Sequence, residues 1–320
     1  MPPTQMPAQS PWRGPVVVAG ALTLDVLVPV PAEVVEDART RVEEIRQVPG
    51  GPAAIAAVTL ARLGVDTTLV VPRGRDPEGD MALGALATVP RLTVRAVPVS
   101  VSTQASVVLS CRARGTRTIL SRIDDLTAAD EDAMVAQVRS LGFAVLHVDA
   151  TRPALARRLI NIAAERGARV SLDAGHLRRE DLLTLLPGVT LVAADQGSTR
   201  ALHPDPVRAI QHMHERGVEI AVSTLGPGGA MVSSGGGVTR VPALAVPVTD
   251  TTGAGDVFHG ALLAYLLAGH APVAAVRRAC AAAALTLDHL GGFPEHLTRE
   301  AVDQLADAAP HRVPGETPSP

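Results

Sequence analysis

The sequence predicts an α/β protein in which helices cover both faces of a mostly parallel β-sheet, an αβα sandwich. Apolar runs rich in β-branched residues alternate along the chain with alanine-rich stretches of helical spacing, which is typical of consecutive βαβ units. The chain has 320 residues, 47% of them hydrophobic, which is enough to bury one large core. We therefore expect a single domain over residues 15–308.

The central elements follow from these patterns in chain order. Buried strands are expected at residues 16–20, 67–71, 144–148, 169–173, 190–193 and 219–223. Helices are expected between them, at residues 53–63, 153–166 and 206–216. The glycines at 235–237 join residues 230–233 and 238–241, which predicts a β-hairpin.

A second group of segments alternates between apolar and polar residues, as strands with one solvated face do. These segments are residues 27–34, 47–48, 93–101, 105–111 and 116–120. They predict a small antiparallel β lid over the sheet's edge, with strands from about 27–48 and 93–120. Residues 1–14 and 309–320 are expected to be flexible ends.

Composition restricts the partners. A net charge of -3 and a pI near 6.4 argue against nucleic acid or a membrane surface. Two cysteines outside any CxxC pattern, with no signal peptide or membrane-spanning run, predict a cytoplasmic protein. All 29 basic residues are arginine, so the chain has no P-loop lysine, protein-kinase strand lysine or pyridoxal lysine. A phosphate site here must use backbone amides, arginine and metal.

The segment DTTGAGDVFHGA, residues 250–261, is the most informative part of the chain. A helix that begins near Ala254 would direct its first N–H groups and the positive end of its dipole at an anion beside Gly253, Ala254 and Gly255. Asp256 would then stand beside a phosphate. We expect it to remain ionised there and to accept the proton of a hydroxyl that attacks phosphorus.

Plainer interpretations stay open. Gly253 and Gly255 could merely shape a strand-to-helix turn, with Asp256 as a first-turn acid. His259, three residues after Asp256, is expected to be a packing histidine. His212 and His214 would lie on different helix faces, so no metal site is expected between them.

Three other places suggest ligand contacts. Asp25 follows the first strand and could accept hydrogen bonds from sugar hydroxyls, or could simply form a turn. Gly50 and Gly51 open a helix, where bare backbone can approach a ligand or form a tight turn. The loop at residues 223–229 could wrap a nucleotide, and Arg117 with Arg122 on the lid could reach an anionic substrate group or face solvent.

In this order, the motifs resemble the ribokinase, or PfkB, family of carbohydrate kinases. The resemblance covers about nine-tenths of the chain, and its most specific part is DTTGAGD. It implies an αβα sandwich with a β lid, ATP-dependent phosphorylation of a sugar hydroxyl, and Mg²⁺ with the nucleotide. The lid strands of the family also make a homodimer plausible.

Carried over by position, the resemblance implies that Asp256 is the base and that the anion hole is formed by Gly253, Ala254 and Gly255. It implies a sugar site formed by Asp25, Gly50, Gly51 and Arg117. It also implies a nucleotide site formed by Thr224, Gly226 and Gly229. Asp250 and Thr252 match positions that often hold a monovalent cation such as K⁺, and Asp195 would contact Mg²⁺ through water. The phosphoryl acceptor is expected to be a ketose or modified ketose.

Two positions depart from the family pattern. Ile55 stands where an asparagine usually reaches the substrate, and Ser198 stands where N-x-x-E has its glutamate. The segments at 50–54, 250–261 and 282–294 resemble the branch that contains ketohexokinase and sulfofructose kinase, where N-x-x-E is commonly altered. A non-catalytic sugar or nucleotide sensor and a nucleoside kinase remain as alternatives; five aromatic residues leave little to stack on a base.

Overall fold

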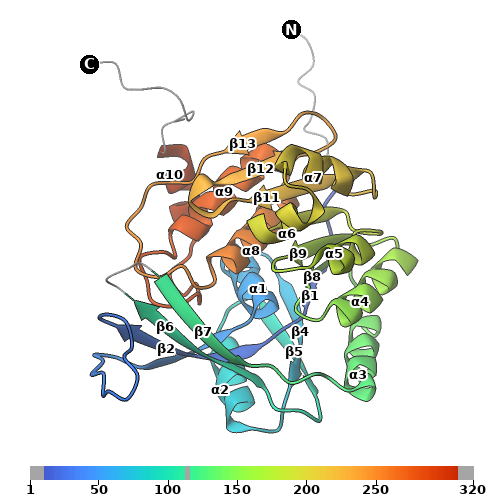
Figure 1. Cartoon of the computed structure of the whole chain (residues 1–320). Coiled ribbons are helices and arrows are strands. Elements are labelled where there is room, and N and C mark those ends of the chain that lie inside the picture. The colour runs from blue at the N-terminus through green and yellow to red at the C-terminus, as the bar shows by residue number, and fades with distance from the viewer. Residues whose placement is uncertain (1–10, 112–115, 309–320) are drawn as a thin grey trace, which may run out of the picture.

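A nine-stranded sheet runs through the described part of the chain, residues 11–111 and 116–308 of this computed structural model (Figure 1). The pairings β11–β12 and β12–β13 are antiparallel and the others are parallel. In sheet order the strands are β13 (Thr239–Val241), β12 (Ala230–Ser233), β11 (Ile220–Thr224), β10 (Leu191–Ala194), β9 (Arg169–Ala174), β8 (Val145–Asp149), β1 (Val16–Ala19), β4 (Thr67–Arg73) and β5 (Leu92–Pro98). The six predicted buried strands and the hairpin are confirmed.

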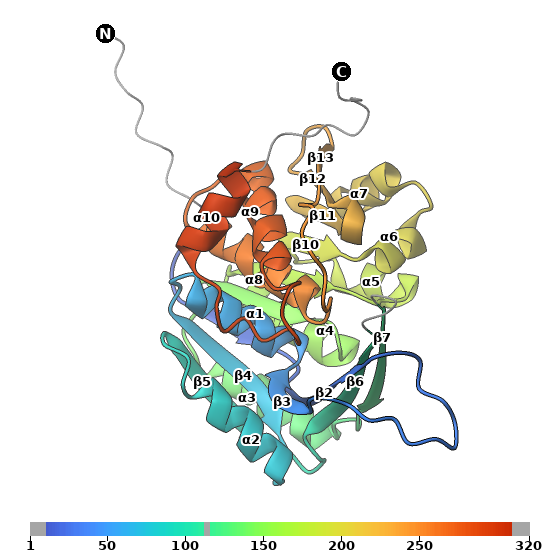
Figure 2. The same cartoon turned by 90° about the vertical axis from the view of Figure 1, so that its left-hand side faces the viewer.

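Helices cover both faces of this sheet, as Figure 2 shows from the side. One layer contains α1 (Pro52–Arg62), α2 (Pro77–Leu86), α8 (Ala254–Leu267), α9 (Pro272–Ala284) and α10 (Arg299–Ala308). The other contains α3 (Ala128–Arg139), α4 (Pro153–Glu165), α5 (Arg179–Leu185), α6 (Gln196–Leu202) and α7 (Pro206–His214). Alternate residues of β1 enter the two apolar cores, Val16 and Val18 on one face and Val17 and Ala19 on the other. The predicted αβα sandwich is therefore confirmed.

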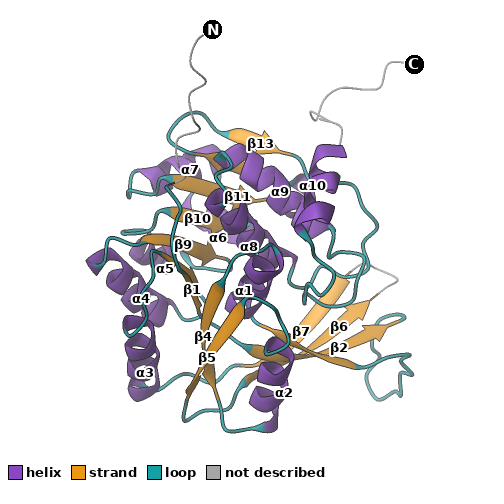
Figure 3. Ribbon diagram, turned by 180° about the vertical axis from the view of Figure 1, so that it is seen from behind, coloured by secondary structure: helices purple, strands orange, loops and turns teal. Residues whose placement is uncertain are grey.

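The lid is a second, four-stranded sheet in the order β3 (Arg46–Gly50), β2 (Thr23–Val30), β6 (Gln104–Cys111) and β7 (Thr116–Arg122) (Figure 3). Two expectations about it were wrong. Residues 93–101 do not join it, because β5 pairs with β4 in the main sheet. The lid is also mixed rather than antiparallel, since β2 and β6 run parallel. Alternation reports one solvated face, and an edge strand of the main sheet has that pattern as readily as a lid strand.

The folded body begins before residue 15. Trp12, expected in a flexible leader, is 2% exposed, and the Arg169 guanidinium lies 5.2 Å from its ring centroid. Residues 1–10 and 309–320, the rest of the expected flexible ends, lie outside the described residues. No helix in the described ranges has the length and apolar run that crossing a bilayer requires.

Candidate active site

The turn before α8 is held by the carboxylate of Asp250, which is 5% exposed. Its Oδ1 accepts hydrogen bonds from the amide and the hydroxyl of Thr252, at 2.9 and 2.7 Å, and its Oδ2 accepts one from the Gly291 amide at 3.0 Å. Gly253 has φ +72°, and a Cβ there would lie 2.4 Å from Cα of Gly292. The turn therefore requires glycine at 253 and has a fixed shape.

This turn presents unpaired backbone donors. Gly253 caps α8 without a side-chain hydrogen bond, and the Ala254 amide makes only a 3.4 Å contact with the Thr251 carbonyl. Among the described residues, the amides of Gly255 and Asp256 have no acceptor. Residues 257–266 of the helix are all buried, so these donors stand on a rigid support. The predicted helix start at Ala254 is confirmed, and the site suits an anion.

Asp256 is half-buried in the first turn of α8. Burial raises the pKa of this carboxyl to about 8, and the charges of Asp173, Asp149 and Asp25 add to this effect. The expectation that the helix N-terminus keeps Asp256 ionised was therefore wrong for the unliganded protein. The positive end of one helix dipole is outweighed by desolvation and three nearby carboxylates.

The predicted sugar side brings Asp25, Gly50 and Gly51 together. Oδ1 of Asp25 accepts a hydrogen bond from the Thr23 hydroxyl at 2.9 Å, and a Cβ at Gly50 would lie 1.9 Å from Oδ2 of Asp25. Gly51 has φ +97°, and a Cβ there would be 2.6 Å from the Ala21 carbonyl oxygen. Both glycines are needed by geometry, and burial raises the pKa of Asp25.

Asp149 was missed by the sequence analysis. Its Oδ2 accepts hydrogen bonds from the Ala21 amide at 2.7 Å and the Ala53 amide at 3.1 Å, so it joins the end of β8 to the loop after β1 and to the start of α1. The predicted strand stopped at residue 148, one residue short. A carboxylate at the carboxyl end of a central parallel strand was the signal available.

The predicted nucleotide side is a cavity of about 720 Å³, within the range of small-molecule sites. Its walls include all three residues predicted for the nucleotide: Thr224, Gly226 and Gly229. Gly229 has φ +85°, and a Cβ there would lie 2.0 Å from the Val241 carbonyl oxygen. The same cavity reaches Ala254 and Gly255, so it opens onto the unpaired amides of α8.

Arg117 lies on this same cavity, the one with the residues predicted for the nucleotide, although we expected it at the sugar. Its guanidinium donates a hydrogen bond from the lid strand β7 to the Thr251 hydroxyl, in the turn before α8. A lid residue thus contacts the turn before α8 directly. The neighbouring Arg122 instead donates to the Thr103 carbonyl at 2.9 Å.

The side chains predicted to contact metal ions already form hydrogen bonds with other groups of the protein. Asp195 caps α6 by accepting from the Ser198 amide at 2.7 Å, and its other oxygen accepts from the His176 amide at 3.2 Å. The described residues contain no group of three or more His, Cys, Asp or Glu side chains arranged for a metal. Mg²⁺ near Asp195 would therefore need ligand or backbone oxygens in addition to that carboxylate. A monovalent cation near Asp250 and Thr252 would need them as well.

The two departures from the family pattern are built into packed structure. Ile55 is 2% exposed in the apolar core around α1. Ser198 is 1% exposed, and its hydroxyl accepts a hydrogen bond from the Leu177 amide at 2.8 Å. Neither leaves an unpaired polar group behind.

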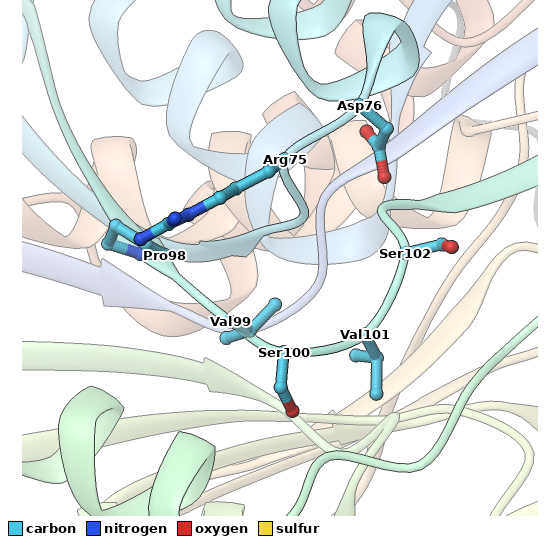
Figure 4. Close-up of a pocket in the computed structure, with 7 residues that line it drawn as sticks. All are labelled: Arg75, Asp76, Pro98, Val99, Ser100, Val101 and Ser102. Atoms are coloured by element: carbon cyan, nitrogen blue, oxygen red, sulfur yellow. The ribbon is translucent and has the colours of Figure 1, made fainter.

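A separate hollow of about 530 Å³ lies between the loop after β4 and the segment after β5, with Arg75, Asp76 and residues 98–102 around it (Figure 4). Asp76 is occupied there: its carboxylate accepts hydrogen bonds from the Gly79 amide at 2.9 Å and the Thr103 amide at 2.6 Å. This hollow shares no lining residue with the cavity predicted for the nucleotide. Asp76 therefore caps the start of α2 and ties it to the loop at Thr103.

Comparison with known proteins identifies the family. The sequence profile of the pfkB family of carbohydrate kinases matches residues 15–295, so this chain belongs to that family. Its members are ATP-dependent phosphotransferases, and this chain is accordingly a carbohydrate kinase. A ribokinase from Haemophilus influenzae is 28% identical over 278 residues, 81% of this chain and 88% of the relative.

Solved structures agree in fold. Phosphofructokinase-2 from Escherichia coli, in complex with potassium, superposes with a TM-score of 0.78 at 22% identity, over 91% of this chain and 97% of that one. Ribokinase from Arabidopsis thaliana, complexed with ribose and ATP, gives 0.73 at 21% identity, over 92% and 99%. These identities show a shared fold; the substrate has to be argued from the site.

Proposed function

We propose that this kinase transfers the γ-phosphoryl group of ATP to a hydroxyl of a ketose or modified ketose, with Asp256 as the base. One observation carries the proposal. Ala254 and Gly255 at the start of α8 line the cavity that we assign to the nucleotide, and Asp256 beside them is near enough to Asp25 for that charge to raise its pKa. An acceptor hydroxyl and a phosphoryl group can meet only at such a junction.

In this reaction Asp256, as a carboxylate, accepts the hydroxyl proton while the sugar oxygen attacks phosphorus. The turn at 253–255, with the adjoining Asp256 amide, donates hydrogen bonds to the phosphoryl oxygens as charge spreads over them. Arg117 adds a positive charge from the lid, next to Thr251. Closure of the lid would exclude water and so suppress ATP hydrolysis.

Asp25, Gly50 and Gly51 would hold the sugar, and Thr224, Gly226 and Gly229 the nucleotide. Mg²⁺ would arrive with ATP, because it prefers phosphate and water oxygens, and it would neutralise phosphate charge. Asp195 is the protein group that would contact it through water. We also place a monovalent cation beside Asp250 and Thr252, a proposal that the potassium complex of Escherichia coli phosphofructokinase-2 supports by analogy.

The test is ADP release with Mg-ATP against ketoses, sulfonated and phosphorylated ketoses, pentoses and nucleosides, with and without K⁺. We expect turnover to depend on a ketose and to fall by 100-fold or more in Asp256→Asn. Asp205→Asn is the matched control, since Asp205 caps α7 away from the site and asparagine caps equally well. Full activity in Asp256→Asn would remove Asp256 from the mechanism.

The same panel addresses the alternatives. Saturable binding without transfer to any acceptor would favour a non-catalytic sensor. Turnover with nucleosides would show that the phosphoryl acceptor is a nucleoside and not a ketose. We further propose a homodimer through the lid in the cytoplasm. All seven residues of the lid's edge strand β7 are exposed, and an open strand edge can pair with a second copy.

A further inference from the structure

Four polar side chains lie in the core beneath Asp256. His147 and Asp149 alternate along β8, and Ser171 and Asp173 lie beside them in register on β9. All four are at most 7% exposed. They share the sheet face that α8 covers, because Val145, two residues before His147, belongs to the same apolar core as that helix. Polar groups persist in such a core only when they are paired or needed.

Asp173 pairs with His259, which lies one helical turn after Asp256 on α8. Nε2 of His259 is 3.1 Å from Oδ1 of Asp173, and both side chains are about nine-tenths buried. Burial opposes the charge on each partner, but their mutual attraction outweighs it: the pKa of His259 is raised and that of Asp173 is lowered. Both shifts favour the form of the pair in which His259 is an imidazolium and Asp173 a carboxylate.

A second histidine behind this pair is neutral. The ring centroid of His147 lies 6.1 Å from that of His259, and its Nδ1 is 2.9 Å from the Ser171 hydroxyl. Burial, together with the charge of His259, lowers the pKa of His147 to about 3. The charged groups that act on His259 are thus Asp173 from β9, Asp256 from its own helix and Asp195 from the start of α6. Of these two histidines, His259 is the one whose surroundings favour the charged form.

We propose that His259 is a positioning residue: held beside Asp173 in a buried ion pair, it fixes a positive charge one turn from Asp256 and favours ionisation of that carboxyl, which the neighbouring carboxylates oppose. Residues three apart on a helix have Cβ atoms about 5–6 Å apart. Among the charged groups that act most strongly on Asp256, three are carboxylates and His259 is the cation. This inference rests on Asp256 as the base proposed above.

The pH profile separates this role from a purely structural one. In His259→Gln the cation is lost, so the acid limb of kcat/KM should move up by about one pH unit, about a tenfold loss at pH 6.5 that is regained at high pH. In the double variant Asp173→Asn/His259→Gln a neutral amide pair replaces a neutral ion pair. The acid limb should then return toward that of the wild type.

His212→Gln is the matched control, because His212 forms an exposed pair with Glu215 at 3.0 Å on α7. Its profile should match the wild type. An acid limb that does not move in His259→Gln would overturn the proposal, even if the overall rate falls. Failure of the base itself is distinguishable, because Asp256→Asn would then remain active.

A measurement on the unaltered protein covers the case in which the variants fail to fold. The ten histidines are labelled with ¹⁵N, and the ring of His259 is identified by its T-shaped contact with the ring of Phe258, at 6.0 Å between centroids. We expect both of its nitrogens to remain protonated at pH 7.5, above the ordinary pKa of histidine. A neutral His259 ring at pH 6.5 would overturn the proposal.

Discussion

Replacing Asp256 with asparagine should stabilise the unliganded protein at neutral and alkaline pH, although it slows phosphoryl transfer by about 100-fold or more. The pKa of Asp256 is raised from 3.8 to about 8 by burial and by neighbouring carboxylates. Between these two values the folded protein binds a proton that the unfolded chain has released. The free energy of unfolding therefore falls as the pH rises from about 4 to about 8, and it is level above that.

The magnitude follows from the shift. One pKa unit corresponds to about 1.4 kcal/mol. Between pH 6 and pH 8, the titration of Asp256 can therefore lower the free energy of unfolding by at most about 2.7 kcal/mol. Asp256 keeps partial contact with water and its neighbours can take up protons in its place, so we expect about 1–2 kcal/mol. Asparagine cannot ionise and so does not lose this stability, which should give the variant a melting temperature about 1.5–3 °C above the wild type at pH 9.

The assay is thermal unfolding of wild type and Asp256→Asn without ligands, from pH 6 to pH 9.5. The advantage of the variant should grow up to about pH 8 and then stay constant. Asp205→Asn, on the exposed start of α7, should follow the wild type throughout. A difference that does not change with pH, or a variant less stable than the wild type at pH 9, would refute the reasoning about Asp256.

Three further predictions concern the sugar side, the second helix layer and the lid. Gly50→Ala should raise the KM for the sugar at least tenfold in steady-state kinetics and leave ATP binding unchanged, because the new Cβ would lie 1.9 Å from Oδ2 of Asp25; an unaltered sugar KM would contradict this. Asp130→Ala should lower the free energy of unfolding in urea by about 1–2 kcal/mol, since Asp130 and Thr127 form a capping box at the start of α3. The pKa of Asp130 is held at about 2 by its hydrogen bonds, so this stabilisation is present above about pH 4 and is lost as the pH falls through 2, where the two proteins should converge. Leu120→Arg, at a side chain 59% exposed on β7, should convert dimers to monomers in sedimentation, and a wild type that is already monomeric at micromolar concentration would remove the proposed lid dimer.

Local patterns predicted the core of this fold well. The helix at residues 254–267 and its glycine turn could be predicted because each constraint is encoded within a few residues: Gly253 needs positive φ, and a long apolar run needs burial. The buried parallel strands could be predicted for a similar reason, since a continuous β-branched run has few other structures available.

Assignments that depend on distant partners could not be predicted. β5 has the alternation of a half-exposed strand, and only its pairing with β4 shows that it is an edge of the main sheet. Arg117 was placed at the sugar because it is on the lid, yet its contact is with Thr251, 134 residues away in the sequence. Local patterns in a single sequence do not show which residues far apart in the chain will contact each other.

The charge state of Asp256 is the clearest case of this limit. Its helix position argues for a low pKa, and that argument used every local fact available. Burial of the carboxyl is the largest effect that reverses it, and the charges of Asp173, Asp149 and Asp25, which come from three different strands, add to burial. The sequence showed each of them at or just beyond the end of an apolar run, but it did not show that all three face one carboxyl.

These carboxylates cannot simply be removed to restore an ionised base. Asp149 holds the amides of Ala21 and Ala53, so it fixes the approach of α1 to the sheet, and Asp25 lies against Gly50 on the sugar side. A site that keeps them needs a compensating positive charge, and a buried cation is itself unfavourable unless it is paired. The pairing of His259 with Asp173 supplies part of that charge. The cation lies on the helix that carries Asp256 and lowers the pKa of its carboxyl, whereas the charge of Asp173 raises it. The double variant tests this argument most directly, because it removes both charges and retains the packing.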